Sequence, residues 1–323
     1  MKNLNGRYFF GLACTVAGAG LWGFSGSCAQ YLTQVDGVHP IFLTAFRSCV
    51  AVVFFFLCIA VRKFNLERNG HTFVGPFHTI AKNRRLIKGF VLFALSLGTD
   101  QFAYSATVAL TNAGTATILQ MLSAVVVMVV TCLLARKFPK VRELAALILA
   151  MIATVLISTQ GDITSVVLPF WGLFWGIVNA IAVAGYIMFP ERFGLFQAIG
   201  SFASVACGTL FCAVVGSLAV FGCELCGIDI FTNVFALDSF GWLVATGGLG
   251  FTGTFLAFGL YVSGVKIVGP VLGSLLGAVE PVSAAIVSWA WLGTDFTLWD
   301  SSGLILMVAM LVLVTVRKEK AAA

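Results

Sequence analysis

The sequence predicts an all-α integral membrane protein whose ten transmembrane helices form two inverted five-helix repeats. Three observations lead to this prediction: the composition, a series of apolar spans and the distribution of charge. Of the 323 residues, 60% are hydrophobic and 10% are charged, and the mean hydropathy is +1.02. A soluble globular chain carries about 25% charged residues. Helices are required because lipid cannot satisfy the open edge of a sheet.

Ten apolar spans account for most of the chain. A bilayer core of about 30 Å needs about 20 apolar residues per helix, and the fifth and tenth spans are the shortest. The first span follows basic residues, as in a signal peptide, but its apolar run is too long, so we interpret it as a retained helix. The spans are residues 9–32, 41–61, 89–109, 114–135, 143–159, 168–189, 198–221, 240–262, 270–292 and 299–316.

Basic residues fall in alternate loops. Of the 19 lysines and arginines, all but Arg47 precede the first span or follow an even-numbered span, and the intervening loops carry only acids. By the positive-inside rule, both termini and the basic loops are predicted to be cytoplasmic. The net charge of +6 is therefore interpreted as a topology signal, and no nucleic-acid partner is expected.

The second half of the chain repeats the first. A stretch that begins at Tyr104 aligns without a gap to one that begins at Tyr261, and the apolar spans coincide. Because each repeat holds an odd number of spans, the two copies enter the membrane in opposite orientations. Many transporters use such inverted repeats to build a substrate site near the bilayer midplane. The expected repeats are residues 1–160 and 161–323.

The polar residue types do not form a recognisable catalytic or metal-binding pattern. The nine cysteines and three histidines have no zinc-ligand spacing, and neither a nucleophile–base pair nor a phosphate-binding glycine loop occurs. The sequence therefore predicts no enzyme activity, no cofactor and no metal. Most of the cysteines lie in apolar spans and are expected to pack as small hydrophobes. Cys223 and Cys226 lie in an outer loop, and whether they form a local disulfide with each other stays open.

Charged side chains inside the spans are the first functional candidates, because each costs about 2.5–3.5 kcal/mol at the bilayer centre on insertion scales. Asp100 follows Lys88 by a stretch of helix about 18 Å long, which places it near the midplane. Glu280 lies midway between Lys266 and Asp295 and is also expected at mid-depth. Either acid could instead have a structural role in a buried ion pair, and that alternative stays open.

Two neighbouring features are predicted to shape the site. Pro281 removes a backbone donor and predicts a helix break beside Glu280. Arg47 is a shallower buried charge, seven residues after Pro40, and is predicted to have a structural role by pairing with a buried acid or with helix-end carbonyls.

Aromatic and amide side chains complete a predicted substrate cavity. In the third span, polar residues recur at helical spacing around Asp100 and form a polar stripe. An apolar cavity with a few polar groups suits a small amphipathic ligand, although each aromatic residue alone is more often a packing residue. The predicted cavity residues are Trp22, Asp100, Gln101, Tyr104, Gln120, Asn179, Tyr186, Tyr261 and Glu280.

Four segments resemble the EamA type of the drug/metabolite transporter superfamily. They are LWGFSG at 21–26, Phe46-Arg47, Asn112-Ala113-Gly114-Thr115-Ala116-Thr117, and SLLGAVEPVSAAIVSWAWLG at 274–293. The resemblance covers nearly the whole chain and implies ten helices in two repeats. The first repeat departs from the pattern, because Ser123-Ala124 stands where the family often has a proline.

The resemblance implies a secondary transporter in the cytoplasmic membrane that exports small organic metabolites, such as amino acids, by alternating access. No ATP-binding motif occurs, so the energy would come from a gradient or from exchange, with protons as a candidate coupling ion. Two alternatives stay open: a lipid-carrier flippase, and a membrane-embedded enzyme that acts on lipid. The substrate, the direction and the oligomeric state do not follow from the sequence.

Overall fold

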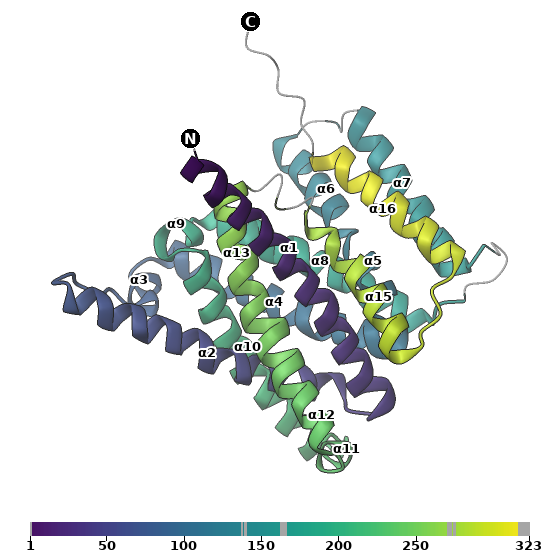
Figure 1. The fold of residues 1–323 in the computed structure, drawn as a ribbon, viewed down its shortest axis with the longest axis horizontal. Helices are drawn as coiled ribbons and strands as arrows, with labels where there is room; N and C mark the ends of the chain where they lie inside the picture. The colour runs from purple at the N-terminus through teal and green to yellow at the C-terminus, as the bar shows by residue number, and fades with distance from the viewer. Residues whose placement is uncertain are drawn as a thin grey trace, which may run out of the picture.

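The computed structural model describes residues 2–136, 138, 141–161, 167–269, 273 and 276–315. Within these ranges the fold is helical, with no strand (Figure 1). Seven helical segments are long and apolar enough to cross a membrane. They are Gly6–Val35, Pro40–Arg68, Arg84–Leu110, Ala113–Ala135, Phe170–Phe193, Ser201–Leu225 and Ser239–Val268. Three shorter apolar helices lie where the fifth, ninth and tenth spans are predicted, and part of the ninth span falls outside the described residues.

The individual elements have the following bounds. The first half contains α1 (Lys2–Gln30), η1 (Tyr31–Val35), α2 (Pro40–Arg68), α3 (Pro76–Ala81), α4 (Arg84–Leu110), α5 (Ala113–Gln120), α6 (Ser123–Ala135) and α7 (Val141–Thr159). The second half contains α8 (Phe170–Phe193), α9 (Leu195–Ile199), α10 (Ser201–Leu225), α11 (Thr232–Phe235), α12 (Ser239–Leu243), η2 (Val244–Leu256), α13 (Ala257–Val268), α15 (Val279–Leu292) and α16 (Leu298–Thr315). The two η elements are π-helical.

Short polar side chains set several helix starts. The Asn83 side chain accepts a hydrogen bond from the Arg85 backbone N–H, and Asn112 caps α5 through the Thr115 N–H at 2.8 Å. Such caps satisfy backbone donors that a helix start leaves free. At α2, Pro40 occupies the first turn, where its missing N–H removes no helical bond.

The most extensive helix contacts join the two halves of the chain. They are α4 with α8, α1 with α13, α2 with α10 and α7 with α16. The α1–α13 contact is close because small residues line it. A Cβ added at Gly18 would lie 2.7 Å from the Tyr261 backbone nitrogen, so only glycine permits this approach. α1 therefore lies at the centre of the bundle, in contact with α13, α15 and η2.

Two helices are interrupted at matching depths. α5 ends at Gln120, and a turn at Met121–Leu122 precedes α6. In the second half, a turn at Ala278 precedes α15. The alignment of Tyr104 with Tyr261 pairs Met121 with Ala278, so both turns occupy one register. Only the second is followed closely by a proline: Pro281 lies in the first turn of α15 beside Glu280, and the turn at Ala278 precedes it by three residues.

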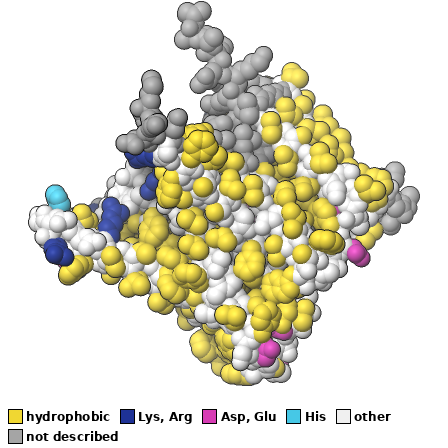
Figure 2. All heavy atoms as spheres, in the orientation of Figure 1, with side chains coloured by type: hydrophobic (Ala, Val, Ile, Leu, Met, Phe, Trp, Pro, Cys, Tyr) yellow, Lys and Arg dark blue, Asp and Glu magenta, His cyan; other side chains and the backbone are white. Residues whose placement is uncertain are grey.

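The surface is mostly apolar, with charge concentrated at two ends (Figure 2). Lys and Arg side chains lie near the start of α1 and the end of α2, and Asp and Glu side chains lie near α11 and α12 and beside the segment between α15 and α16 (Figure 2). We name these the basic end and the acidic end. Large apolar side chains are exposed between them, including Leu218 and Trp289 at 66% and 64%, as expected for a surface in contact with lipid.

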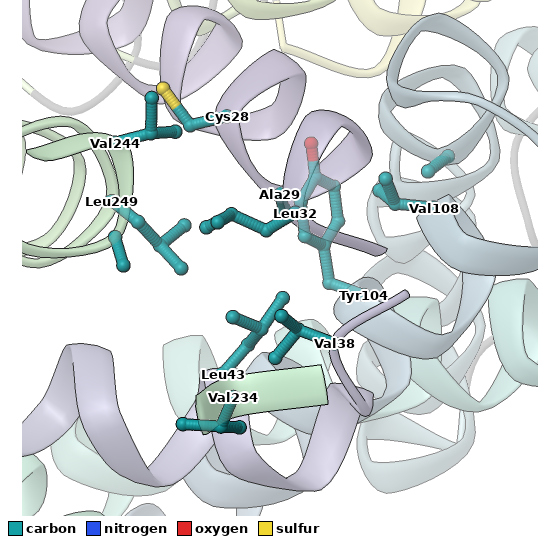
Figure 3. Close-up of a cluster of buried hydrophobic side chains, with 12 residues drawn as sticks. Cys28, Ala29, Leu32, Val38, Leu43, Tyr104, Val108, Val234, Val244 and Leu249 are labelled. Atoms are coloured by element: carbon teal, nitrogen blue, oxygen red, sulfur yellow. The ribbon is translucent and has the colours of Figure 1, made fainter. Parts of the chain in front are cut away.

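A buried apolar cluster closes the bundle toward the acidic end (Figure 3). Leu32, Leu43 and Leu249 are fully buried and bring α1 and its η1 extension against α2 and η2. Tyr104 enters this cluster from α4 and carries its hydroxyl toward α1 (Figure 3). The cluster fixes α1, α2, α4 and η2 around the cavity described next.

Candidate functional site

A cavity of about 50 Å³ lies where helices from both halves meet. Its lining combines one guanidinium, two carboxylates, two amides and four aromatic rings. The lining residues are Trp22, Ser25, Arg47, Asp100, Gln101, Tyr104, Gln120, Tyr186, Phe258 and Glu280. Seven of the nine residues predicted for a substrate cavity are among them: Trp22, Asp100, Gln101, Tyr104, Gln120, Tyr186 and Glu280. They come from α1, α4, α5, α8 and α15.

The other two predicted residues lie just behind the lining. Asn179 is buried in α8, and its Nδ2 donates to the Asp100 Oδ1 at 2.8 Å and to the Asp100 backbone oxygen at 3.1 Å. Tyr261 packs its ring against Trp22 at a centroid distance of 4.6 Å, and its hydroxyl donates to the Gly273 carbonyl at 3.0 Å. These side chains therefore position lining residues and do not line the cavity themselves.

Glu280 faces the cavity from the second interrupted helix. It lies in the first turn of α15, and the Gln120 Nε2 donates to its Oε1 at 3.2 Å. Gln120 is the last residue of α5, so the two helix interruptions meet through this hydrogen bond. The turn at Ala278 directs Glu280 inward, whereas the equivalent position in the first half holds Ser123.

Arg47 is predicted to pair with a buried acid or with helix-end carbonyls, and its hydrogen-bond partner in the structure is a hydroxyl. The guanidinium is only 4% exposed, and its Nε donates to the Thr254 hydroxyl at 2.9 Å. The predicted ion pair with a buried acid is not formed, since the only ion pair within 4.0 Å among the described residues joins Lys63 and Glu67 on the surface. The reason is that η2 packs beside α2 and supplies a hydroxyl, so the cation shares the cavity with the acids without pairing to them.

Two polar atoms of the lining lack a hydrogen-bond partner in the part of the chain that the structure describes. They are the Gln101 Oε1 and the Tyr104 hydroxyl, on side chains that are 7% and 8% exposed. An unsatisfied buried polar group costs about 1–3 kcal/mol. The Tyr104 hydroxyl lies against Gly26 in α1, where a Cβ would meet it. Glycine at this position keeps space beside the hydroxyl.

Ser25 and Phe258 complete the lining and do not stand out in the sequence. Ser25 lies within the LWGFSG segment, one of the four that resemble the EamA type, and that resemblance could have indicated it. Phe258 is one of 30 phenylalanines, and nothing in its spacing separates it from packing residues. Among the described residues, no group of three or more His, Cys, Asp or Glu could hold a metal. Cys223 and Cys226 are free thiols.

Comparison with known proteins decides the family. The model of the EamA-like transporter family matches twice, at residues 9–159 and 170–316. The chain belongs to this family. A curated relative, the uncharacterized inner membrane transporter YicL of Salmonella typhimurium strain LT2, is 30% identical over 313 residues, which is 97% of each chain. A solved structure described only as "Crystal structure of protein" has a TM-score of 0.60 at 17% identity, covers 96% of this chain and 99% of its own, and shows the fold alone.

The EamA-family transporter closes its cavity toward the acidic end with a polar cluster. The Gln30 Nε2 donates to the Thr294 hydroxyl at 2.8 Å, and its Oε1 accepts from the Ala113 N–H at 2.9 Å and from the Ser288 hydroxyl at 3.1 Å. The Ser288 and Ser27 hydroxyls are 3.0 Å apart. We name these five residues the Gln30 clasp. It joins α1 to α5, to α15 and to the segment that follows α15.

Toward the basic end, aromatic packing closes the cavity of the transporter. The Trp22 ring lies edge-on to Phe258 at 4.8 Å and beside Tyr261 at 4.6 Å. We name these three residues the Trp22 cluster. It joins α1 to α13 by ring contacts, and the Tyr261 hydroxyl also donates a hydrogen bond to the Gly273 carbonyl beyond α13.

Proposed function

We propose that this membrane transporter is a secondary exporter of small organic metabolites such as amino acids, and that the cavity is its substrate site. The observation that carries the proposal is one buried lining with a guanidinium and two carboxylates that do not pair within 4.0 Å. Unpaired charges in a membrane interior are costly and mark substrate or ion pathways.

The lining fits a zwitterion. A substrate carboxylate would bind Arg47 through charge-assisted hydrogen bonds, with the Tyr104 hydroxyl as a further donor. A substrate ammonium would bind Asp100 or Glu280, with the Gln101 Oε1 as a neutral acceptor. Trp22, Tyr186 and Phe258 would contact an apolar side chain. Asn179 and Tyr261 act behind the lining by holding Asp100 and Trp22.

The cavity must widen during transport. Pockets that bind small molecules measure about 300–1,000 Å³, well above the 50 Å³ found between the two ends. We propose that residues 1–160 and 161–323 are inverted repeats within a ten-helix fold and that they rock against each other. In this plan α8 corresponds to α1, and α13 corresponds to α4. The contact of α1 with α13 then corresponds to the contact of α4 with α8, and both contacts are extensive. The matching turns at Met121 and Ala278 also support the two-fold plan.

We place the protein in the inner membrane. In the proposed orientation, the basic end and both termini face the cytoplasm. It rests on the charge separation between the two ends and on the positive-inside rule. Export then moves substrate from the basic to the acidic end. Asp100 and Glu280 are the candidates for exchanging a proton during the cycle, because either acid can lose its charge when the substrate ammonium leaves.

Transport in proteoliposomes tests the proposal. A panel of radiolabelled amino acids would be assayed for exchange and for accumulation driven by a pH gradient, with wild type, Arg47→Gln, Asp100→Asn and Glu280→Gln. We expect Arg47→Gln to abolish exchange, and at least one amide variant to keep exchange while losing gradient-driven accumulation. Glu67→Gln, a surface acid paired with Lys63, is the control. Wild-type transport in all three cavity variants would overturn the proposal.

A further inference from the structure

The end of α2 extends beyond the hydrocarbon core. The helix has 29 residues, which at 1.5 Å per residue is about 43 Å, whereas the core is about 30 Å thick. Its apolar run ends at Val61 and is followed by Arg62 and Lys63. Figure 1 shows this end of α2 projecting from the bundle near α3. The last two turns therefore lie at the depth of the lipid headgroups.

A groove of about 510 Å³ follows one face of this projecting end. Its lining residues recur every three to four positions, which is the spacing of a single helix face. They are Leu57, Cys58, Val61, Arg62, Asn65, Leu66 and Asn69. The lining is apolar where α2 leaves the hydrocarbon core and becomes polar toward its end, so the groove has the same polarity gradient as a phospholipid.

We infer that this groove binds an anionic phospholipid, with the phosphate at Arg62, Asn65 and Asn69 and an acyl chain along Leu57 and Val61. A guanidinium matches the geometry of a phosphate and can donate two parallel hydrogen bonds to it. The two asparagine side chains are one helical turn apart and supply amide donors. The inference is independent of the substrate proposed for the central cavity.

Charge complementarity favours an anionic lipid. Residues 62–88 contain seven lysines and arginines and one acid, Glu67. Glu67 lies on the opposite face of α2, where it pairs with Lys63 at 3.9 Å, so the groove contains Arg62 without a nearby acid on its own face. Basic side chains gather at this end of the molecule (Figure 2). Clusters of this kind attract anionic headgroups electrostatically.

Exposed apolar side chains near the end of α2 indicate a membrane surface as the environment of the groove. Phe64, between Lys63 and Asn65 in the sequence, is 64% exposed, and Val74 in the loop after α2 is 59% exposed. Phe77 in α3 packs against Phe56 and Phe90 at centroid distances of 6.4 Å, which fixes the loop to the bundle. Exposed apolar groups beside cations are typical of segments that lie in the interface plane.

Native mass spectrometry of the full-length protein in detergent tests the site. Dioleoyl phosphatidylglycerol and dioleoyl phosphatidylcholine would be titrated against wild type, the double variant Arg62→Gln/Asn69→Ala, and the matched control Lys63→Gln. The control removes the same charge from the opposite face of the same turn. We expect the double variant to weaken phosphatidylglycerol binding about fivefold or more, because it loses charge-assisted bonds to the phosphate, and the control to change it less than about twofold.

Three outcomes would overturn the inference. One is a loss of phosphatidylglycerol binding in Lys63→Gln as large as in the double variant, which would mean that the lipid responds to surface charge in general. Another is equal binding of phosphatidylcholine by wild type. The third is displacement of phosphatidylglycerol by inorganic phosphate at millimolar concentration, which would assign the site to a free anion. The substituted side chains are exposed, and equal melting temperatures without lipid would verify that all variants are folded.

Discussion

The two ends of the cavity are closed by different chemistry. Toward the acidic end, the Gln30 clasp joins α1 to its neighbours by four short polar contacts. Toward the basic end, the Trp22 cluster joins α1 to α13 mainly by the contact of aromatic rings. The same helix thus takes part in both closures, with its polar residues at one end of the cavity and its large ring at the other.

The difference matters because the two kinds of contact open differently. A hydrogen bond contributes a net stabilisation of about 0.5–1.5 kcal/mol, because water can replace the lost partner. Breaking the bond costs more when water cannot reach the group that is left without a partner. An aromatic contact depends on the large apolar area that the rings bury, so truncation of a ring removes most of it. We therefore expect the clasp to open cooperatively when water enters, and the Trp22 cluster to respond to side-chain size.

The largest effect is expected from Trp22→Ala. Removing a large packed ring costs about 3–5 kcal/mol, and it would leave the basic end of the cavity open. Thermal unfolding in detergent should show the loss, and thiol labelling of a cysteine at Gln101 should become faster. Trp289→Ala is the control, because Trp289 is 64% exposed and faces lipid. An equal loss in both variants would mean that the Trp22 cluster does not close the cavity.

The next effect is expected from Gln30→Leu. The variant keeps the side-chain volume but removes the partner of the buried Ala113 N–H and the Gln30 bonds of the Ser288 and Thr294 hydroxyls, of which Ser288 keeps its contact with Ser27. We expect a stability loss of about 2–3 kcal/mol, the cost of leaving buried polar groups unsatisfied, measured as a shift in unfolding midpoint.

Gln34→Leu provides the comparison for the clasp. Gln34 is an exposed glutamine one turn later that donates to the Val108 and Thr111 carbonyls at 2.9 and 2.8 Å. Because water can reach these carbonyls, its loss should be about 1 kcal/mol or less. A loss at Gln34 equal to that at Gln30 would refute a special role for the clasp.

A smaller effect is expected from Tyr261→Phe. The ring would still pack on Trp22, and only the hydrogen bond to the Gly273 carbonyl would be lost. We expect a loss of about 1 kcal/mol. If chemical unfolding gives a loss comparable to that of Trp22→Ala, the basic end is held by hydrogen bonding and the contrast between the two ends is wrong.

The smallest effect concerns pH at the acidic end. Burial raises the pKa of Asp36, and the charge of Asp238 raises it further. A raised pKa means that the folded state holds the proton more readily, so the stability contribution is present at low pH and is lost as pH rises through the folded pKa. Asp36→Asn should therefore be slightly more stable than wild type at pH 7, by less than about 0.5 kcal/mol.

Melting temperatures at two pH values check this prediction. The advantage of Asp36→Asn over wild type should shrink at pH 3, where Asp36 is largely protonated in both the folded and the unfolded chain. A variant that is less stable than wild type at pH 7 would contradict the sign, and would mean that the Asp36 carboxylate makes a favourable contact at this end.

Side-chain chemistry and depth in the membrane together select residues that lie close to one another in the structure. Asp100, Gln120 and Glu280 stand out because charged and amide groups are costly in lipid, and the structure brings all three to one cavity. Tyr261 and Asn179 have the same signal but lie behind the lining. Helical spacing predicts which face of a helix a residue lies on. Whether that residue lines the cavity or supports a lining residue depends on which neighbouring helix packs against that face.

Other features require the three-dimensional packing. The Gln30 clasp has no sequence signature, because its partners lie more than eighty positions away along the chain. The turn at Met121–Leu122 contains no proline, and hydrogen bonds from Met121 to Ile118 and from Leu122 to Leu119 replace the helical pattern there. Arg47 is predicted to pair with a buried acid or with helix-end carbonyls, and its bond to the Thr254 hydroxyl depends on the path of η2 beside α2.

Locking the clasp tests alternating access most directly. The Ser27 and Ser288 hydroxyls are 3.0 Å apart, so Ser27→Cys/Ser288→Cys, in a background with the nine native cysteines replaced, should form a disulfide across the acidic end. We predict that oxidation abolishes transport in proteoliposomes, that a reductant restores it, and that Ser27→Cys alone is insensitive to oxidation. If the oxidised protein, with its disulfide verified by mass spectrometry, transports as fast as the reduced protein, opening at this end is contradicted.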